Sequence, residues 1–182
     1  FTQVSRFEFL EGQYRRVNNG SSDQVFIYRS AVEGHYTHGA TTLSLELLDA
    51  RQALADEGTP LTRRSVDAAN LQQLYLTWKW PQAFAGNSKV QLNIGRQTLN
   101  LGSRRLISRS ASNVPVSFTG AVVNLESKQG TQWSAFAVAP VLSYPTSRAD
   151  ILDNRVAANK ESHGARLTGV FADLPTTPSG LS

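Results

Sequence analysis

Residues 90–94 alternate apolar and polar side chains and lead directly into a cluster of arginines. Because side chains of a β-strand point to opposite faces in turn, Val90, Leu92 and Ile94 share one face, and Gln91, Asn93 and Gln97 share the other. The arginines that follow are Arg96, Arg104, Arg105 and Arg109. Guanidinium groups stay charged and form paired hydrogen bonds with carboxylates, so this polar face suits a water-filled lumen that meets anions. The solvated edge of a soluble β-protein would show the same pattern.

The same alternation recurs along the chain in strands of roughly ten residues or more. We expect about eight strands, at residues 4–17, 24–37, 40–48, 66–80, 90–94, 116–128, 131–139 and 163–171. Short turns alternate with long polar loops, which we place at residues 49–64 and 144–162. Outer-membrane barrels have this asymmetry, because one rim carries short turns and the other carries long loops. No segment shows a useful helical periodicity.

Two of these strands divide their side chains clearly between an apolar face and a polar face. In the strand at 66–80 the outward residues are Leu74, Leu76, Trp78 and Trp80, and Lys79 points inward with Gln73, Tyr75 and Thr77. In the strand at 24–37, Arg29 and Glu33 lie opposite Phe26, Tyr28, Val32 and Tyr36. Aromatic residues near both rims are typical of the membrane interfaces of a barrel. A core-facing aromatic stripe in a soluble sandwich would look the same.

Composition narrows the classes of function. The chain has 182 residues, no cysteine and a formal net charge of +4, which excludes a thiolate metal site and favours anionic partners. No apolar stretch is long enough for a membrane-spanning helix. The basic residues show no recognition helix, aromatic RNA platform or zinc motif, so we expect no nucleic-acid partner. His35, His38 and His163 lack the spacing of a metal site, and we expect neither a metal nor a cofactor.

Three blocks of the chain resemble the bacterial alginate-export family of outer-membrane porins. They are residues 43–51, residues 70–76, and Ile94-Gly95-Arg96-Gln97 followed by Gly102 and Arg105-Leu106. The resemblance covers residues 6 to about 171. It implies a large antiparallel barrel that passes anionic polysaccharide or related solutes across the outer membrane. One position departs from the family pattern, since Thr119 follows Phe118 where the family commonly has an aspartate.

We therefore expect an all-β fold, an antiparallel transmembrane β-barrel, with residues 1–182 in one domain. About eight strands would close into a barrel too narrow for a polymer, whereas a conducting pore needs roughly 16–18 strands. The chain also begins at Phe1 and ends in a proline-rich loop. We accordingly expect it to be the N-terminal part of a larger barrel in the bacterial outer membrane.

The predicted solute path consists of cations on the wet face. It contains Arg29, Lys79, Arg96, Arg104, Arg105 and Arg109. We expect these groups to lower the barrier for carboxylate-bearing sugars by Coulomb attraction in a confined space. The arginines could equally hold strand register through ion pairs inside the barrel, for which the candidate partners are Glu8, Glu33, Glu46 and Asp49.

The predicted function is a channel for diffusion or export of anionic solutes, in particular acidic polysaccharide such as alginate. Besides the solute, the channel is expected to contact outer-membrane lipid. We expect a monomeric barrel, and periplasmic export partners are compatible with this function. The alternatives are a general porin for small molecules, a small-barrel enzyme of the outer membrane and a soluble β-sandwich binding module. We do not expect an enzyme, because no nucleophile, base and orienting group come together in the sequence.

Overall fold

The computed structural model describes residues 1–10, 23–84, 88–100 and 112–174. Within them it shows one antiparallel sheet of nine strands and one short helix. The elements are β1 (Thr2–Leu10), β2 (Asp23–His38), β3 (Thr41–Ala53), β4 (Asp67–Ala83), β5 (Ser88–Gln97), β6 (Phe118–Ser127), β7 (Gln132–Leu142), α1 (Arg148–Leu152), β8 (Lys160–Glu161) and β9 (Leu167–Asp173). The expected all-β antiparallel fold is confirmed.

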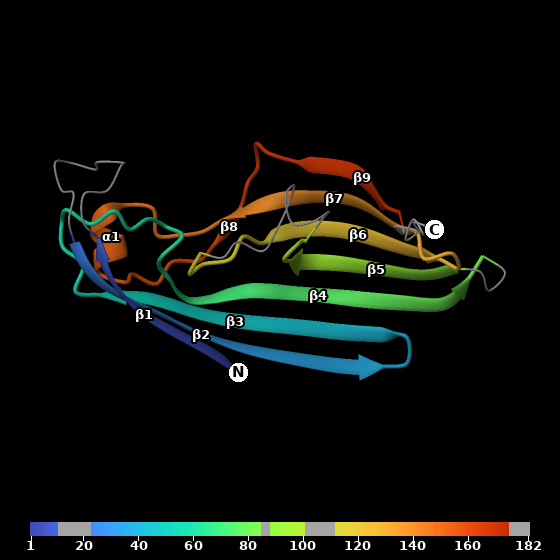
Figure 1. Cartoon of the computed structure of the whole chain (residues 1–182), viewed down its shortest axis with the longest axis horizontal. Helices are drawn as coiled ribbons and strands as arrows, with labels where there is room; N and C mark the ends of the chain where they lie inside the picture. Colours follow the sequence, from blue (N-terminus) through green and yellow to red (C-terminus); the bar gives the residue numbers. More distant parts are fainter. Residues whose placement is uncertain (11–22, 85–87, 101–111, 175–182) are drawn as a thin grey trace, which may run out of the picture.

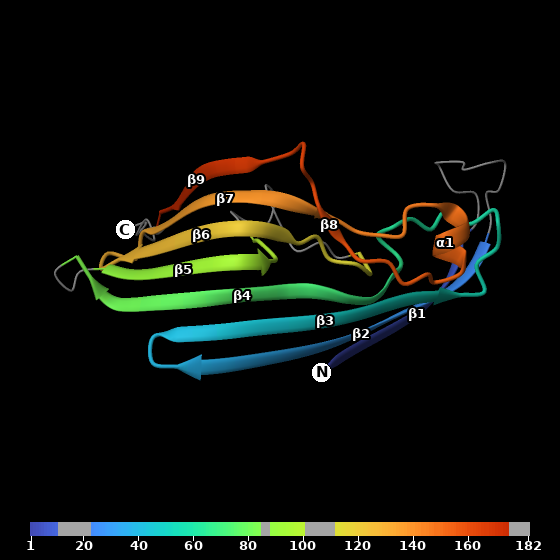
Figure 2. The same cartoon turned by 180° about the vertical axis from the view of Figure 1, so that it is seen from behind.

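Each strand pairs with the next one along the chain, from β1 to β7. β7 then pairs with β8 through two residues and with β9 over seven. The sheet is not closed on itself, and β1 and β9 lie at its two edges (Figure 1). The tight turns at 39–40 and 128–131 lie at one end, which we call the short-turn end. α1 and the loop at 54–66 lie at the other, the long-loop end (Figures 1 and 2).

All eight expected strands are found, although some of their ends differ. The strand expected at 4–17 is described as far as Leu10, and residues 11–17 lie outside the described residues. β3 was expected to end at residue 48 and instead continues to Ala53. The reason is that Ala50 is fully buried on one face, while on the other face the carboxylate of Asp49 accepts a hydrogen bond of 2.9 Å from Nε of Arg51.

The expected polar loop at 144–162 contains α1 and β8. The side chain of Ser147 caps the first turn of α1 by accepting from the backbone N–H of Asp150. The helix has five residues, of which only Ile151 is buried. So short a helix leaves no apolar periodicity in the sequence, which explains why the expectation of a loop was wrong here.

One face of the sheet is apolar and exposed. Its residues include Val32, Tyr36, Leu43, Leu45, Leu47, Leu74, Leu76, Trp80, Ile94, Val123 and Trp133. Trp80, Val90, Leu125 and Trp133 are successive cross-strand partners and form one row near the short-turn end. A soluble sheet rarely exposes so continuous an apolar face, whereas a barrel presents one to lipid and places aromatic residues at its margin. We call this the apolar face, and it is the face on which the alternation predicts these residues.

The opposite face, which we call the inner face, differs between its two ends. Toward the long-loop end it is buried under loop segments, and its side chains form two small apolar clusters. The first contains Ala31, Leu48, Ala50 and Val114, and the second contains Leu99, Phe118, Val122 and Val138. Toward the short-turn end it carries polar side chains. No second sheet covers it within the described residues, so this part of the chain is not a two-layer β-sandwich.

Two glycines face each other across β5 and β6, and each lets its strand approach the neighbour on its other side, β4 for Gly95 and β7 for Gly120. Gly95 and Gly120 are cross-strand partners, with φ of 131° and 153°. A Cβ atom on Gly95 would lie 2.4 Å from the carbonyl oxygen of Leu74, and one on Gly120 would lie 2.2 Å from that of Ala137. Because backbone atoms cannot move aside as side-chain ends can, both positions require glycine.

We predict that Gly95→Ala and Gly120→Ala each lower the free energy of unfolding by roughly 1–3 kcal/mol, because the backbone must shift or remain strained. Gly34→Ala is the matched control, since no atom lies within 4 Å of a Cβ there and its φ is not positive. Urea titrations of the protein in lipid vesicles, followed by tryptophan fluorescence, measure the difference. Equal stabilities for all three variants would contradict the close approach.

Candidate functional site

Polar side chains cover the inner face toward the short-turn end, and we call them the polar wall. Hydrogen bonds link neighbours across it: Thr37 with Thr42 and His35 with Ser44 at 3.0 Å each, Asn93 with Thr77 and with Gln91 at 3.0 Å each, and Ser134 with Asn124 at 2.7 Å. These pairs follow from the alternation, because each strand places every second residue on this face. The polar wall therefore runs across six strands, β2 to β7.

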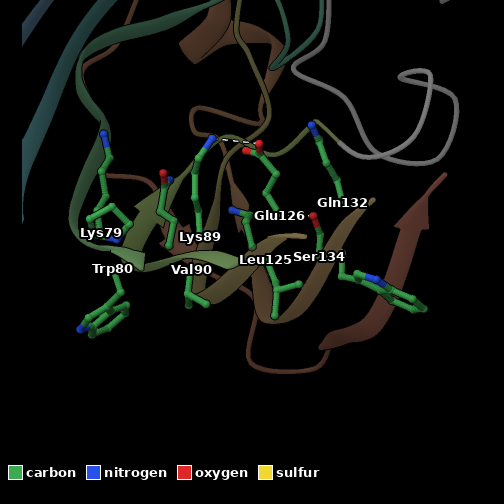
Figure 3. Close-up of a pocket in the computed structure, with 12 residues that line it drawn as sticks. Lys79, Trp80, Lys89, Val90, Leu125, Glu126, Gln132 and Ser134 are labelled. Carbon is green, nitrogen blue, oxygen red and sulfur yellow. Dashed lines mark hydrogen bonds and ion pairs between the residues drawn. The ribbon is translucent and has the colours of Figure 1, made fainter. Parts of the chain in front are cut away.

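Charged groups extend the polar wall at its edge near the short turns. Nζ of Lys89 on β5 lies 3.0 Å from a carboxylate oxygen of Glu126 on β6. Figure 3 shows Lys79, Lys89, Glu126 and Gln132 pointing to one side of the sheet, and Trp80, Val90 and Leu125 pointing to the other. These seven residues line one pocket together with Pro81, Gln91, Asn124, Trp133 and Ser134. Water-exposed cations and apolar aromatic groups are thus separated by the thickness of one sheet.

Lys79 lies on the polar wall, where the alternation predicts it. Its cross-strand partner is Gln91, and its side chain is exposed. Lys89 is also exposed, at 66% of its side-chain surface, although it pairs with Glu126. An exposed ion pair contributes little to stability, at most about 1 kcal/mol. Both ammonium groups are therefore accessible from the solvent on this face.

Arg29 lies on the inner face of β2, also as predicted, but nearer the long-loop end. Its guanidinium donates a 3.3 Å hydrogen bond to the backbone carbonyl of Asn113. Asn113 is buried, and its own side-chain amide donates to the carbonyls of Tyr28 and Ser65. Arg29 is thus partly covered by the segment at 112–117.

Arg96 lies where β5 ends. Its cross-strand partners are Leu74 on β4 and Thr119 on β6. Its Cβ therefore lies on the apolar face, the face of Ile94. The guanidinium turns along β4, donates to the carbonyl of Leu71 at 3.1 Å and attracts the carboxylate of Asp67. Thr119, the departure from the family pattern, therefore lies where a carboxylate would be the nearest cross-strand neighbour of this arginine.

The remaining predicted arginines, Arg104, Arg105 and Arg109, lie outside the described residues. Their place in the solute path stays a prediction from the sequence.

The four carboxylates predicted as ion-pair partners occupy different environments. Glu46 is buried and accepts a hydrogen bond from the side-chain amide of Gln73, and Glu33 is its exposed cross-strand partner. Glu8 pairs with Arg6 at 3.1 Å on the same strand. Asp49 lies on the face opposite to Glu46. It shares the apolar face with Leu47 and pairs there with Arg51. The ion pairs of Glu8 and Asp49 are thus made with arginines of their own strands, Arg6 and Arg51, which are not part of the predicted path.

Three charged residues of the site were missed in the sequence. Lys89 shares a face with Gln91, but it was missed because the strand was expected to begin one residue later, at Val90. Glu126 was recognised as a strand residue, and its partner on β5 depends on a register that periodicity does not give. Asp67 is fully buried and is held by the amides of Asn70 and Asn159 at 2.7 and 2.6 Å. Asn70 lies three residues away on the same strand, whereas Asn159 comes from a distant part of the chain, and no local pattern marks it.

No group of three or more histidine, cysteine, aspartate or glutamate side chains that could hold a metal ion occurs among the described residues. The helix in the described ranges is also too short to cross a membrane.

Comparison with known proteins places the chain in a family. The family model described as alginate export matches residues 2–168, nearly the whole chain. No curated protein and no solved structure matches it. The matching family is a transport family of outer-membrane porins, not a family of enzymes, and the open antiparallel sheet with one exposed apolar face fits that architecture. The chain belongs to the alginate export family.

Proposed function

We propose that this chain forms part of the wall of an outer-membrane channel that passes anionic solutes, in particular acidic polysaccharide such as alginate. The observation that carries the proposal is the two-sided sheet, with a hydrogen-bonded polar wall behind an exposed apolar face. In a barrel this arrangement puts lipid on one side and water on the other. The family match supports the same reading.

The proposed solute path has a cationic entrance at the short-turn end. Lys79 and Lys89 stand next to the amides and hydroxyls of Gln91, Asn124 and Ser134. Ammonium groups attract the carboxylates of uronic acids, and amide and hydroxyl groups exchange hydrogen bonds with sugar hydroxyls. These groups replace part of the hydration shell of a sugar acid, which lowers the cost of moving it from bulk water into the channel.

Arg29, Arg104, Arg105 and Arg109 complete the proposed path on the sequence argument. Arg96 stays in it although its Cβ lies on the side of Ile94, because its guanidinium turns along β4 and attracts the buried carboxylate of Asp67. Arg29 is the member whose inner-face position supports this role directly. Asp49 is left out of the proposed lumen, because it shares a face with exposed Leu47. A monomeric barrel and periplasmic export partners remain part of the proposal.

A general porin is the second candidate, and the mixed charge of the inner face favours it. Lys89 pairs with Glu126, and Arg6 pairs with Glu8, so part of the positive charge is neutralised locally. A channel of this kind would pass small solutes with weak preference for anions. Ion selectivity separates the two candidates.

We predict that Lys79→Gln with Lys89→Gln lowers the ratio of anion to cation permeability of the complete channel roughly twofold or more, because two cations leave the entrance. Arg63→Gln with Arg64→Gln is the matched control, since it removes two positive charges from exposed positions of the loop at 54–66, at the long-loop end. Reversal potentials in planar bilayers under a salt gradient give the ratio. A ratio unchanged by the double substitution would rule out a charged entrance here.

We predict the opposite sign for Glu126→Gln. It removes the carboxylate that pairs with Lys89 and leaves the ammonium group free, so anion preference rises. Glu57→Gln, at an exposed position in the loop between β3 and β4, serves as the control. The same bilayer measurement applies, and a fall in anion preference would favour the general porin.

We predict that Arg105→Ala, and to a smaller extent Arg96→Ala, reduces anion preference, because each removes a fixed positive charge from the proposed path. Arg51→Ala is the control, since Arg51 pairs with Asp49 on the apolar face. Conductance and reversal potential are measured together. Should both variants keep the anion preference of the parent channel, these arginines have a structural role only.

A further inference from the structure

The long-loop end of the inner face is covered by a segment that returns from far along the chain. This segment, residues 143–159, connects β7 to β8 and contains α1, and we call it the β7–β8 segment. It lies against β3 and β4, which are not its neighbours in the sheet. Its contacts are made with Gln52, Asp67 and Asn70, which are buried.

The first attachment joins the segment to β3 through a pair of reciprocal hydrogen bonds. The side-chain oxygen of Asn154 accepts from the backbone N–H of Gln52 at 2.7 Å, and its side-chain amide donates to the carbonyl of Gln52 at 2.9 Å. The amide of Gln52 in turn donates to the carbonyl of Leu152 at 2.6 Å. Asn154 has a φ of 51°, a conformation that asparagine tolerates better than most residues. Its side chain thus extends the hydrogen bonding of β3 as a further strand would.

The second attachment joins the segment to β4. Asn70 donates to the carbonyl of Ala157 at 2.9 Å, and Asn159 donates to the buried carboxylate of Asp67 at 2.6 Å. The side-chain oxygen of Asn159 also accepts from the backbone N–H of Tyr144 at 2.8 Å, which ties the two ends of the segment together. Ala68 and Val156 form an isolated parallel β-bridge between the same two elements.

The segment is also ordered internally. Ser147 caps α1, and the carboxylate of Asp150 pairs with Arg155 at 2.9 Å. The hydrogen bonds from Arg155 and Ser147 lower the pKa of the Asp150 carboxyl group. Ile151 is buried beneath α1. The β7–β8 segment thus has a capped helix, a buried apolar residue and hydrogen bonds to two strands, which hold it against the inner face at the long-loop end.

We propose that the β7–β8 segment is a fixed wall that narrows the channel at its long-loop end and sets the largest solute that passes. This inference rests on the proposed channel function and adds to it a determinant of size, separate from the charged entrance at the other end. The residues beneath the segment, Gln52, Asp67 and Asn70, are buried, so water and solute are kept from that surface. The segment occupies volume that the barrel would otherwise give to the lumen.

The test compares the complete channel protein with a variant that carries Asn154→Ala and Asn159→Ala. Loss of both side chains removes the two bonds between Asn154 and the backbone of Gln52 and the bond from Asn159 to Asp67. The bonds from Gln52 to Leu152 and from Asn70 to Ala157 remain, so we expect the segment to loosen from β3 and β4. We expect a roughly twofold rise in single-channel conductance and passage of larger neutral polyethylene glycols. Ala158→Ser, at an exposed position of the same segment, is the control. Unchanged conductance and unchanged polymer cut-off in a folded variant, recognised by heat-modifiable gel mobility, would overturn the proposal.

A second variant covers the case in which the first does not fold. Ala68→Cys with Val156→Cys joins two bridge partners by a disulfide, in a chain that has no cysteine of its own. A fixed wall predicts the same conductance before and after reduction. A conductance that appears only after reduction would show that the segment must move aside, which overturns the proposal.

These results are distinguishable from a failure of the channel function. Neutral polymers report size alone, whereas reversal potentials report charge. A protein that forms no channel removes both proposals. A channel with normal anion preference whose size does not respond to the segment removes only this one.

Discussion

Continuous antiparallel pairing of the backbone is the constraint on which the rest of this structure depends. In a bilayer no water is available to an unpaired N–H or C=O group, so each strand must find partners on both sides. β2 to β7 do so, each between its neighbours in sequence. Because the backbone N–H and C=O groups are paired within the sheet, the side chains on its two faces can differ completely in polarity. Leu76 and Ile94 are exposed on one face, while Thr77 and Asn93 exchange a hydrogen bond on the other.

The sequence predicts the strands well because a period of two is a local signal. The expected strand at 24–37 lies within β2, and the one expected at 131–139 begins one residue before β7. It also predicts correctly that Lys79 and Arg29 lie opposite the exposed aromatic residues. Strand ends are predicted less well, and β3 shows why. Asp49 and Arg51 look like loop residues, but their mutual ion pair lets the strand continue while Ala50 is buried beneath it.

The candidate site is only half predictable, because its contacts join residues that are distant in sequence. Alternation assigns Glu126 to a face but does not choose Lys89 as its partner, since register is a property of the paired strands. Asn113, Asn154 and Asn159 look like ordinary loop residues. Each forms a hydrogen bond with a strand far along the chain, Asn113 with β2, Asn154 with β3 and Asn159 with β4. The role of an asparagine in a loop therefore depends on which strand that loop packs against.

The two ends of the inner face impose opposite requirements on the chain. At the short-turn end the polar wall can meet water, because Asn124 and Lys89 remain hydrated or paired whether or not a solute is present. At the long-loop end Leu48, Ala50 and Val114 form an apolar cluster that water would destabilise, at roughly 25 cal/mol per Å² of surface exposed. The loops that cover this cluster therefore stabilise the sheet, and in the proposed channel the same loops narrow the lumen. On this proposal, stability and pore size are coupled at the long-loop end, whereas charge selection at the short-turn end can vary with little effect on the fold.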